Sequence, residues 1–327
     1  MTELRKQINN IVEDHQACLI LAKSMNGNEV YEGTTATAGD IVEGKTAYSN
    51  GELLEGTLKS GDGSIINGAL ASGETSYSKL LYLIKAISPN ITISGTSAEY
   101  MFKNCRGITE IPIINTSNIT TMKYMFESCT SLVTIPLLNT SKVTIMRGMF
   151  NNCSSLKTIP VLDTKKVTDM GYMFQKCSSL TELPVLDVSV TSNMTYMFAN
   201  CSSLTEVPFF KVKGDASNMF QGCTKLVSVV LDISNSSNFS SMFASCTSLQ
   251  NVSFLNANST SNMNGMFSSC NNLSDDSLNN ILELCTKASS SYNYKKTLGT
   301  IGLSSEQATR CQSLSNWQAF LDAGWTA

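Results

Sequence analysis

A repeat of about 24 residues constrains this chain more than any other feature of its sequence. The segment MFESCTSLVTIPLLNTSKVTIM at 125–146 is followed directly by RGMFNNCSSLKTIPVLDTKKVTDM, which has the same pattern. Eight cysteines mark the repeat at successive distances of 24, 24, 24, 24, 22, 23 and 24 residues: Cys105, Cys129, Cys153, Cys177, Cys201, Cys223, Cys246 and Cys270. One unit of this size cannot bury its apolar side alone, so the repeat predicts a solenoid whose stacked units share one core.

Each unit has two halves with different patterns. In the first half, apolar residues follow the spacing of one face of a short helix, as in Val143, Met146, Met149, Phe150 and Cys153. In the second half, a β-rich run such as SLVTIPLL predicts a short strand with a recurring proline where no backbone donor is needed. The predicted fold class is therefore an α/β repeat solenoid, leucine-rich-repeat-like, with about eight repeats of 22–24 residues.

Two apolar columns run side by side through the predicted strands. The first contains Ile113, Leu137, Val161, Val185, Phe209 and Phe254, and the second contains Ile114, Leu138, Leu162, Leu186, Phe210 and Leu255. Adjacent residues of a strand point to opposite faces, so an extended chain would bury one column and expose the other. We take the second column as the candidate binding face. In the alternative interpretation, a local turn buries both columns.

The regular cysteine spacing argues against a disulfide framework, whose spacings are usually irregular. The repeat has neither CxxC pairs nor histidines, so it predicts no metal site. We interpret the thiols as small buried apolar groups. Disulfides between cysteines of stacked units are the rival interpretation, since units about 5 Å apart place their Cα atoms within bridging distance.

The unit CSSLxxIPxLDTSxVTxMxxMFxxC resembles the leucine-rich repeats of BspA-type bacterial surface proteins, which also recur in mycoplasmas and in bacteriophage virion proteins. The resemblance covers roughly residues 95–275 and implies a role in adhesion and binding. A second segment, TATAGDIVEGKTAYSNGELLEGTL at 35–58, resembles a short module of phage tail, baseplate and fibre proteins. Within it, Asn50-Gly51 between two short β-rich runs predicts a hairpin turn.

The N-terminal residues 1–26 contain apolar positions in steps of four and three: Leu4, Ile8, Ile11, His15, Cys18, Ala22 and Met25. This seam predicts either a short parallel coiled coil, which would make the protein a homo-oligomer such as a trimer, or an amphipathic helix packed on the body of a chain. In the resemblance to phage proteins, this end would attach to other virion proteins.

The remaining boundaries follow from composition. Residues 27–60 form the small β module, and 61–94 form a linker followed by a helix over 77–88 that caps the solenoid. The solenoid spans 95–273, and 274–327 form a C-terminal cap of two helices, the first opened by Ser274 or Asp275 and the second closed by Gly324. Trp317 and Trp325 are assigned to this cap.

Composition excludes several classes of function. A net charge of −3 argues against nucleic acid as a partner, and no apolar run is long enough to insert into a membrane. The single histidine, His15, lies outside the repeats, and Asp163 and Asp187 fit Asx turns, so we expect neither an enzyme nor a cofactor. The N-terminus has no apolar stretch of signal-peptide length, which favours a protein assembled where it is made.

Together these features predict a structural and adhesive component of a bacteriophage particle, such as a fibre, spike or decoration protein. Its N-terminal third would attach to the virion, assembled in the host cytoplasm, and the solenoid would present a binding surface to a protein or glycan of the host cell. The alternative is a leucine-rich-repeat adhesin on a bacterial cell surface.

Overall fold

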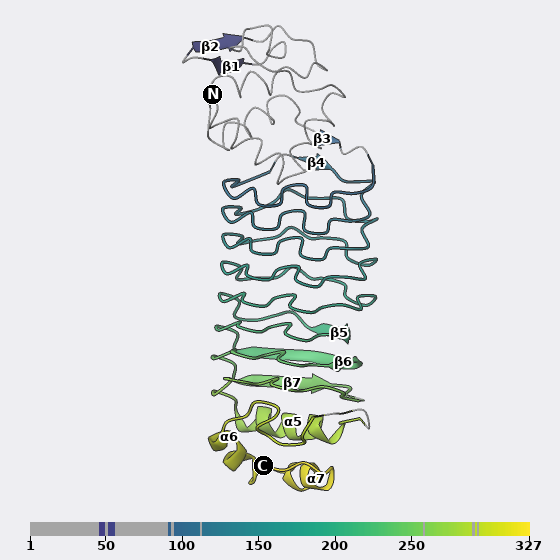
Figure 1. The fold of residues 1–327 in the computed structure, drawn as a ribbon, viewed down its shortest axis with the longest axis vertical. Coiled ribbons are helices and arrows are strands. Elements are labelled where there is room, and N and C mark those ends of the chain that lie inside the picture. Colours follow the sequence, from purple (N-terminus) through teal and green to yellow (C-terminus); the bar gives the residue numbers. More distant parts are fainter. Residues whose placement is uncertain are drawn as a thin grey trace.

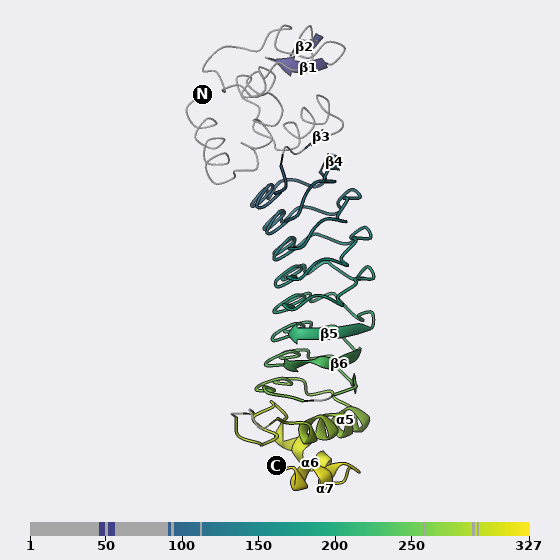
Figure 2. The same ribbon diagram turned by 90° about the vertical axis from the view of Figure 1, so that its right-hand side faces the viewer.

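Stacked rungs form the body of the protein in a computed structural model, and helices close the stack at its C-terminal end (Figures 1 and 2). The structure describes residues 46–49, 52–55, 91–92, 95–111, 113–257, 259–289, 292 and 294–327. Each rung is one sequence repeat, and parallel bridges join successive rungs at positions such as Thr121, Ile145, Asp169 and Asn193. The predicted solenoid is therefore confirmed as a stack of repeats.

The first half of each rung is a pair of tight turns, so the predicted helix is wrong. Met125 N donates to Met122 O at 3.1 Å and Cys129 N donates to Phe126 O at 3.1 Å, which closes two successive three-residue turns. Backbone donors between these turns bond instead to the next rung, as from Phe126 N to Met149 O at 2.8 Å. A helix cannot form because alternate amides are used between rungs.

Two positions in every rung have positive φ and break the helical path. The first column contains Tyr100, Tyr124, Gly148, Tyr172, Tyr196, Asn218, Ser241 and Gly265. The second contains Asn104, Ser128, Asn152, Lys176, Asn200, Gly222, Ser245 and Ser269. Left-handed backbone is favourable for Gly and tolerated by Asn, which accounts for half of the second column, namely Asn104, Asn152, Asn200 and Gly222.

The predicted inward residues are nevertheless buried, because turns of three residues return side chains to the core at nearly the same spacing as a helix. Val143, Met146, Met149, Phe150 and Cys153 are all fully buried. The phenylalanines stack from rung to rung with ring centroids 5.3–5.6 Å apart and nearly parallel planes, through Phe102, Phe126, Phe150, Phe174, Phe198, Phe220, Phe243 and Phe267. This column is the centre of one continuous core.

The second half of each rung, here called the strand side, differs along the solenoid. Strands β3 (Ile91–Thr92) and β4 (Ile114–Asn115) pair in parallel at its start. Strands β5 (Phe210–Asp215), β6 (Ser228–Asn238) and β7 (Asn251–Leu255) form a parallel sheet in the last rungs. Between them, the described segments 137–139, 161–163 and 185–187 form no backbone hydrogen bonds with one another. The predicted strand is thus present only in part of the repeats.

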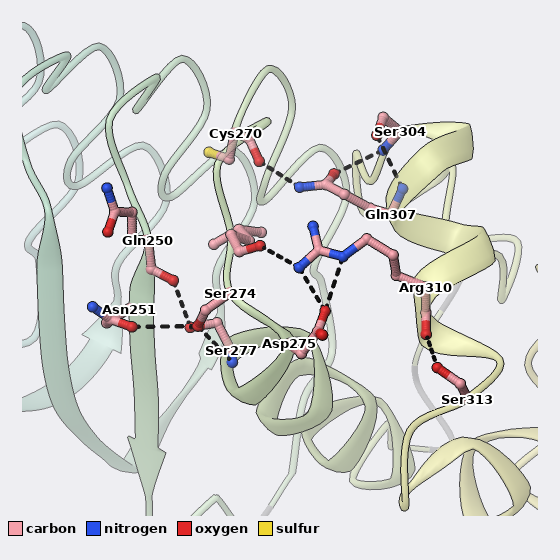
Figure 3. A network of polar contacts seen from close by, with 11 residues as sticks. Gln250, Asn251, Cys270, Ser274, Asp275, Ser277, Ser304, Gln307, Arg310 and Ser313 are labelled. Atoms are coloured by element: carbon pink, nitrogen blue, oxygen red, sulfur yellow. Dashed lines mark hydrogen bonds and ion pairs between the residues drawn. The ribbon is translucent and has the colours of Figure 1, made fainter.

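Helix α5 (Asp275–Thr286) covers the open edge of the sheet and forms the C-terminal cap (Figure 3). The Ser277 hydroxyl donates to Gln250 O and accepts from Val252 N, each at 2.8 Å, and Asn280 Nδ2 donates to Val252 O at 3.0 Å. These side chains bond to backbone groups that another strand would otherwise pair with. Ser274 caps the helix as predicted, since its side chain accepts from Ser277 N.

The predicted second cap helix is two helices, α6 (Ser305–Cys311) and α7 (Trp317–Asp322). Gln307 of α6 donates to Cys270 O at 2.7 Å, and Arg310 pairs with Asp275 at 2.6 Å and donates to Leu273 O (Figure 3). Gly324 follows α7 with positive φ, as predicted, and Trp325 is buried in the cap. The cap is therefore bonded directly to the last rung.

In the N-terminal third, β1 (Thr46–Ser49) and β2 (Glu52–Glu55) pair antiparallel with Ser49 opposite Glu52, as the two strands of the predicted hairpin would, while the predicted turn at 50–51 lies outside the described residues. Three predictions lie outside the described residues: the heptad seam of 1–26, the linker after residue 60 and the helix at 77–88. Residues 95–102 begin the first rung, as their bridge to the next rung and the burial of Ala98 and Phe102 show.

Candidate functional site

A column of exposed aliphatic and aromatic side chains lies on the strand side of the proline-containing rungs. We call this column the apolar stripe. It consists of Ile113, Leu137, Val161, Val185 and Phe209, whose side chains are 60–80% exposed. Along each rung the chain alternates, so that in one unit Leu137 points outward between the buried Ile135 and Leu138. The stripe is the most exposed run of apolar side chains that repeats from rung to rung among the described residues.

The predicted binding face is therefore the wrong one of two adjacent columns. Ile114, Leu138, Leu162, Leu186 and Phe210 are buried in the core. Leu255 is 43% exposed, but it pairs with Asp232, whereas Phe254 pairs with Leu231 of the buried column. Because the repeats after Phe209 are one or two residues shorter, the sequence alignment assigned Leu255 to this column in place of Phe254. The alternative in which a turn buries both columns is also wrong.

Next to the stripe lies an open groove of about 740 Å³, lined by apolar side chains and one polar margin. Leu137, Val161 and Val185 of the stripe line it beside the buried Leu138 and Leu162. The polar margin contains Asn139, Asp163, Lys165 and Asp187. Its volume lies within the range of about 300–1,000 Å³ that is typical of ligand sites.

The acidic margin is built from the Asx turns that the sequence predicts. Asp163 Oδ1 accepts from Lys165 N at 3.2 Å, and Asp187 Oδ1 accepts from Ser189 N at 3.0 Å. The hydrogen bonds from the Ser189 side chain and backbone, together with the charge of Lys165, hold the pKa of Asp187 below its usual value. Both carboxylates therefore stabilise turns. They also give the margin of the groove its negative charge.

A buried threonine column underlies the margin. Thr116 Oγ1 donates to Asn139 O at 2.9 Å, and Thr164 Oγ1 accepts from Asp187 N at 2.8 Å, so each hydroxyl joins two rungs. Thr140 is equally buried and also lines the groove, but within the described chain its hydroxyl makes no hydrogen bond. A buried hydroxyl without a partner is costly, by about 1–3 kcal/mol.

The cysteine column is confirmed as buried thiols rather than disulfides, for all ten cysteines in the described part of the chain. Burial raises the pKa of Cys201 to about 12. The thiols of the repeats also have a role that the sequence did not reveal. Seven of them, from Cys129 to Cys270, each donate to a phenylalanine carbonyl of the preceding rung, as from Cys153 Sγ to Phe126 O at 3.0 Å. The column therefore contributes hydrogen bonds as well as packing.

A second surface feature lies on the turn side and was missed by the sequence analysis. Tyr100 stacks on Tyr124 at 5.5 Å and Tyr172 on Tyr196 at 5.0 Å. Arg147 lies between the two pairs, with its guanidinium 4.7 Å from the Tyr172 ring and its Nε 3.4 Å from Tyr124 Oη. Ion pairs from Lys123 to Glu99 and from Lys103 to Glu127 flank the column at 2.8 and 2.9 Å. The charges on this surface are thus largely paired within the chain.

Comparisons with known proteins place the repeats in a family. A family model described as "Mycoplasma protein of unknown function, DUF285" matches residues 96–211 and 210–298. No curated protein matches the sequence. The T. pallidum leucine-rich repeat protein TpLRR matches with 22% identity over 62% of this chain and 87% of its own, at a TM-score of 0.44. A leucine-rich repeat protein from Bacteroides ovatus ATCC 8483 matches with 18% identity over 57% of this chain and 64% of its own, at a TM-score of 0.26. Among the described residues, no helix is both long and apolar enough to span a bilayer.

Proposed function

The chain belongs to the DUF285 family, and from that premise we propose that it is a non-enzymatic adhesive protein whose apolar stripe binds a partner protein. The observation that carries this proposal is the exposure of five aligned side chains, Ile113, Leu137, Val161, Val185 and Phe209. Contiguous apolar surface on a folded protein costs free energy in water and commonly marks a contact with another molecule.

A protein partner fits this surface better than a glycan. The stripe is aliphatic in its centre, and burial of aliphatic side chains is favourable against another apolar surface. In the stripe, the one aromatic side chain, Phe209, lies at the end of the column, and the tyrosine rings of the other surface already stack on one another.

We further propose that the protein is displayed on a bacteriophage particle, attached through its N-terminal third to other virion proteins and assembled in the host cytoplasm. The resemblance of residues 35–58 to phage tail modules supports this setting. Display on a bacterial cell surface is the second candidate, because the description of the family names a bacterium, mycoplasma, rather than a phage. Homo-oligomerisation through the seam of 1–26 belongs to the same proposal.

The stripe is tested with a triple variant, Leu137→Lys, Val161→Lys and Val185→Lys. These side chains are exposed, so the fold should be unchanged and binding of the labelled full chain to host cells or to purified particles should be lost. The matched control is Thr134→Lys, Thr158→Lys and Thr181→Lys, which adds the same charge at exposed positions outside the stripe. Equal binding of both variants and the unmodified chain would remove the stripe from the function.

The setting is tested by immunogold electron microscopy with an antibody to the solenoid. Label at fixed positions on particles supports the virion proposal, whereas label confined to the cell envelope supports the adhesin. Light scattering of the chain with and without residues 1–26 tests the oligomer, and a monomer in both samples would contradict the coiled coil.

A further inference from the structure

We propose that the segment bound by the apolar stripe is an amphipathic α-helix of the partner, lying along the solenoid axis with basic residues beside its apolar row. This inference rests on the proposed binding function and narrows it to one kind of partner. It is carried by the spacing of the rungs, by the charge of the groove margin and by one buried hydroxyl.

The spacing of the rungs matches the pitch of a helix. Equivalent phenylalanine rings of neighbouring rungs lie 5.3–5.6 Å apart, which measures the repeat along the axis. An α-helix rises about 5.4 Å per turn, so apolar side chains one turn apart meet successive rungs without drifting. In an extended strand, side chains on one face recur about every 6.6 Å, which loses register by about 1 Å per rung.

The length and shape of the site also suit a helix. The stripe covers five rungs, and four intervals of this repeat correspond to about four helical turns, or roughly 15 residues. The groove beside it is open and lined by Leu137, Val161 and Val185. A helix with apolar residues at i, i+4, i+7, i+11 and i+14 presents a row of about the same length.

The charge of the margin indicates what flanks that row. Asp163 and Asp187 line the groove on one side, together with a single lysine, Lys165. The margin is therefore net negative, and complementary charge would come from Lys or Arg side chains of the partner.

Thr140 supplies an independent indication of a ligand. Its hydroxyl is buried, belongs to a residue that lines the groove, and makes no hydrogen bond within the described chain. The equivalent hydroxyls of Thr116 and Thr164 are bonded between rungs. Rotation of the Thr140 side chain toward the groove would let a polar side chain of a bound helix supply the partner that this hydroxyl lacks.

The test uses the full chain and two labelled synthetic peptides of 16 residues with identical composition. In the first, a chemical staple fixes a helix with Leu one turn apart and Lys beside the Leu row. In the second, Leu and Lys alternate as in a strand. Fluorescence anisotropy should show the helical peptide binding at least about tenfold more tightly than the alternating one.

The same variants as above locate the binding. The triple Lys variant of the stripe should weaken the helical peptide by at least about tenfold, and the Thr134, Thr158 and Thr181 control should leave its Kd unchanged. Thr140→Val should weaken it severalfold without loss of folded structure. If the triple variant were misfolded by circular dichroism, Val161→Thr would replace it, since threonine keeps the shape of valine and only reduces its apolar surface.

The outcomes separate this inference from the proposed function. Equal or tighter binding of the alternating peptide, binding that survives in the stripe variant, or no binding of either peptide would overturn the helix. If in those cases the stripe variant still loses binding to cells or particles, the proposed function stands with another kind of partner. If that binding is also unchanged, both proposals fall.

Discussion

The rungs that contain Pro136, Pro160 and Pro184 bury the same Met, Phe and Cys columns as the later rungs, but their strand sides are joined by different hydrogen bonds. In the later rungs, β5, β6 and β7 form a backbone ladder. In the earlier ones, the hydroxyls of Thr116 and Thr164 join neighbouring rungs instead. The threonine column becomes Val188 and Val212 as the ladder begins, so the hydroxyls of this column are present only before the ladder.

This contrast explains where the candidate site lies. The exposed column is apolar as far as Phe209 and Val230, and then continues with Ser253 in the sheet. Apart from Ile114 and Asn115 of β4, the groove is lined by rungs without a ladder. One common core therefore carries two different surfaces, and we propose that only the first binds a partner.

The largest expected effect tests whether both regions depend on one core. Burial raises the pKa of Cys201 in the first region and of Cys270 in the second, each to about 12, and also raises the pKa of Cys153, Cys177, Cys223 and Cys246. Unfolded thiols ionise near pH 8.5, so above that pH only the unfolded state releases protons, and stability falls until the folded pKa is reached.

Each of these thiols should remove about 1.4 kcal/mol of unfolding free energy per pH unit in that window. Chemical unfolding followed at pH 7, 9 and 10 should show a steep loss, with amides of both regions exposed together in hydrogen exchange. Cys201→Ala should reduce the dependence of the unfolding free energy on pH by the contribution of one thiol. A midpoint that does not change from pH 8 to pH 11 would contradict the shared buried column.

The next effect compares two left-handed glycines. A Cβ at Gly148 would overlap the Tyr124 ring, whereas at Gly265 the nearest atom is Ser268 Oγ at 3.2 Å. Both Gly→Ala changes carry a backbone cost of about 1–2 kcal/mol at positive φ. Gly148→Ala should lose about 1 kcal/mol more, because Tyr124 must leave its stack on Tyr100. Thermal unfolding measures the difference, and equal losses would show that the tyrosine column adds nothing to the first region.

A smaller effect distinguishes two threonines of the first region. Thr164→Val should destabilise the protein by about 1 kcal/mol, because it leaves Asp187 N without its acceptor. Thr140→Val should stabilise it by about 1 kcal/mol, because it removes a buried hydroxyl that has no partner in the described chain. Denaturant midpoints of the two variants should therefore move in opposite directions. A shift of both midpoints in the same direction would mean that the two hydroxyls do not differ in their hydrogen bonding.

The smallest effect tests proline as the cause of the missing ladder. Replacing Pro136, Pro160 and Pro184 by Val restores a donor in three adjacent rungs. The loss of proline costs about 0.4–1 kcal/mol each through the unfolded chain, and new hydrogen bonds should offset most of it. Amides of 137–139 and 161–163 should then exchange more slowly. Unchanged exchange would assign the missing ladder to the Asx turns instead.

Much of the core could be predicted from the sequence because burial follows the repeat itself. The same spacing could not distinguish a helix from successive three-residue turns, since both return Met149, Phe150 and Cys153 to the core. A usable signal was present in the second left-handed column, where Asn152, Asn200 and Gly222 recur at one position. These residue types favour positive φ, which a helix excludes.

The candidate site was less predictable, because two adjacent apolar columns contain no information about which one faces inward. The orientation is set by contacts between rungs, which bury Leu138 and leave Leu137 exposed.

In the cap, too, local sequence signals predicted only part of the structure. Ser274 was predictable from local capping, but the break between α6 and α7 is set by Asn279 of α5, which bonds to both the backbone and the side chain of Asn316.

The covered edge of the sheet has a consequence for how such proteins can vary in size. Because Ser277 and Asn280 of the cap bond to the backbone of the final rung, the end of the stack is independent of how many rungs precede it. A gene that gains or loses one 24-residue unit would lengthen or shorten the molecule by one interval of about 5.5 Å while keeping its terminus intact. The number of repeats therefore sets the length of the molecule, while the cap that closes it stays the same.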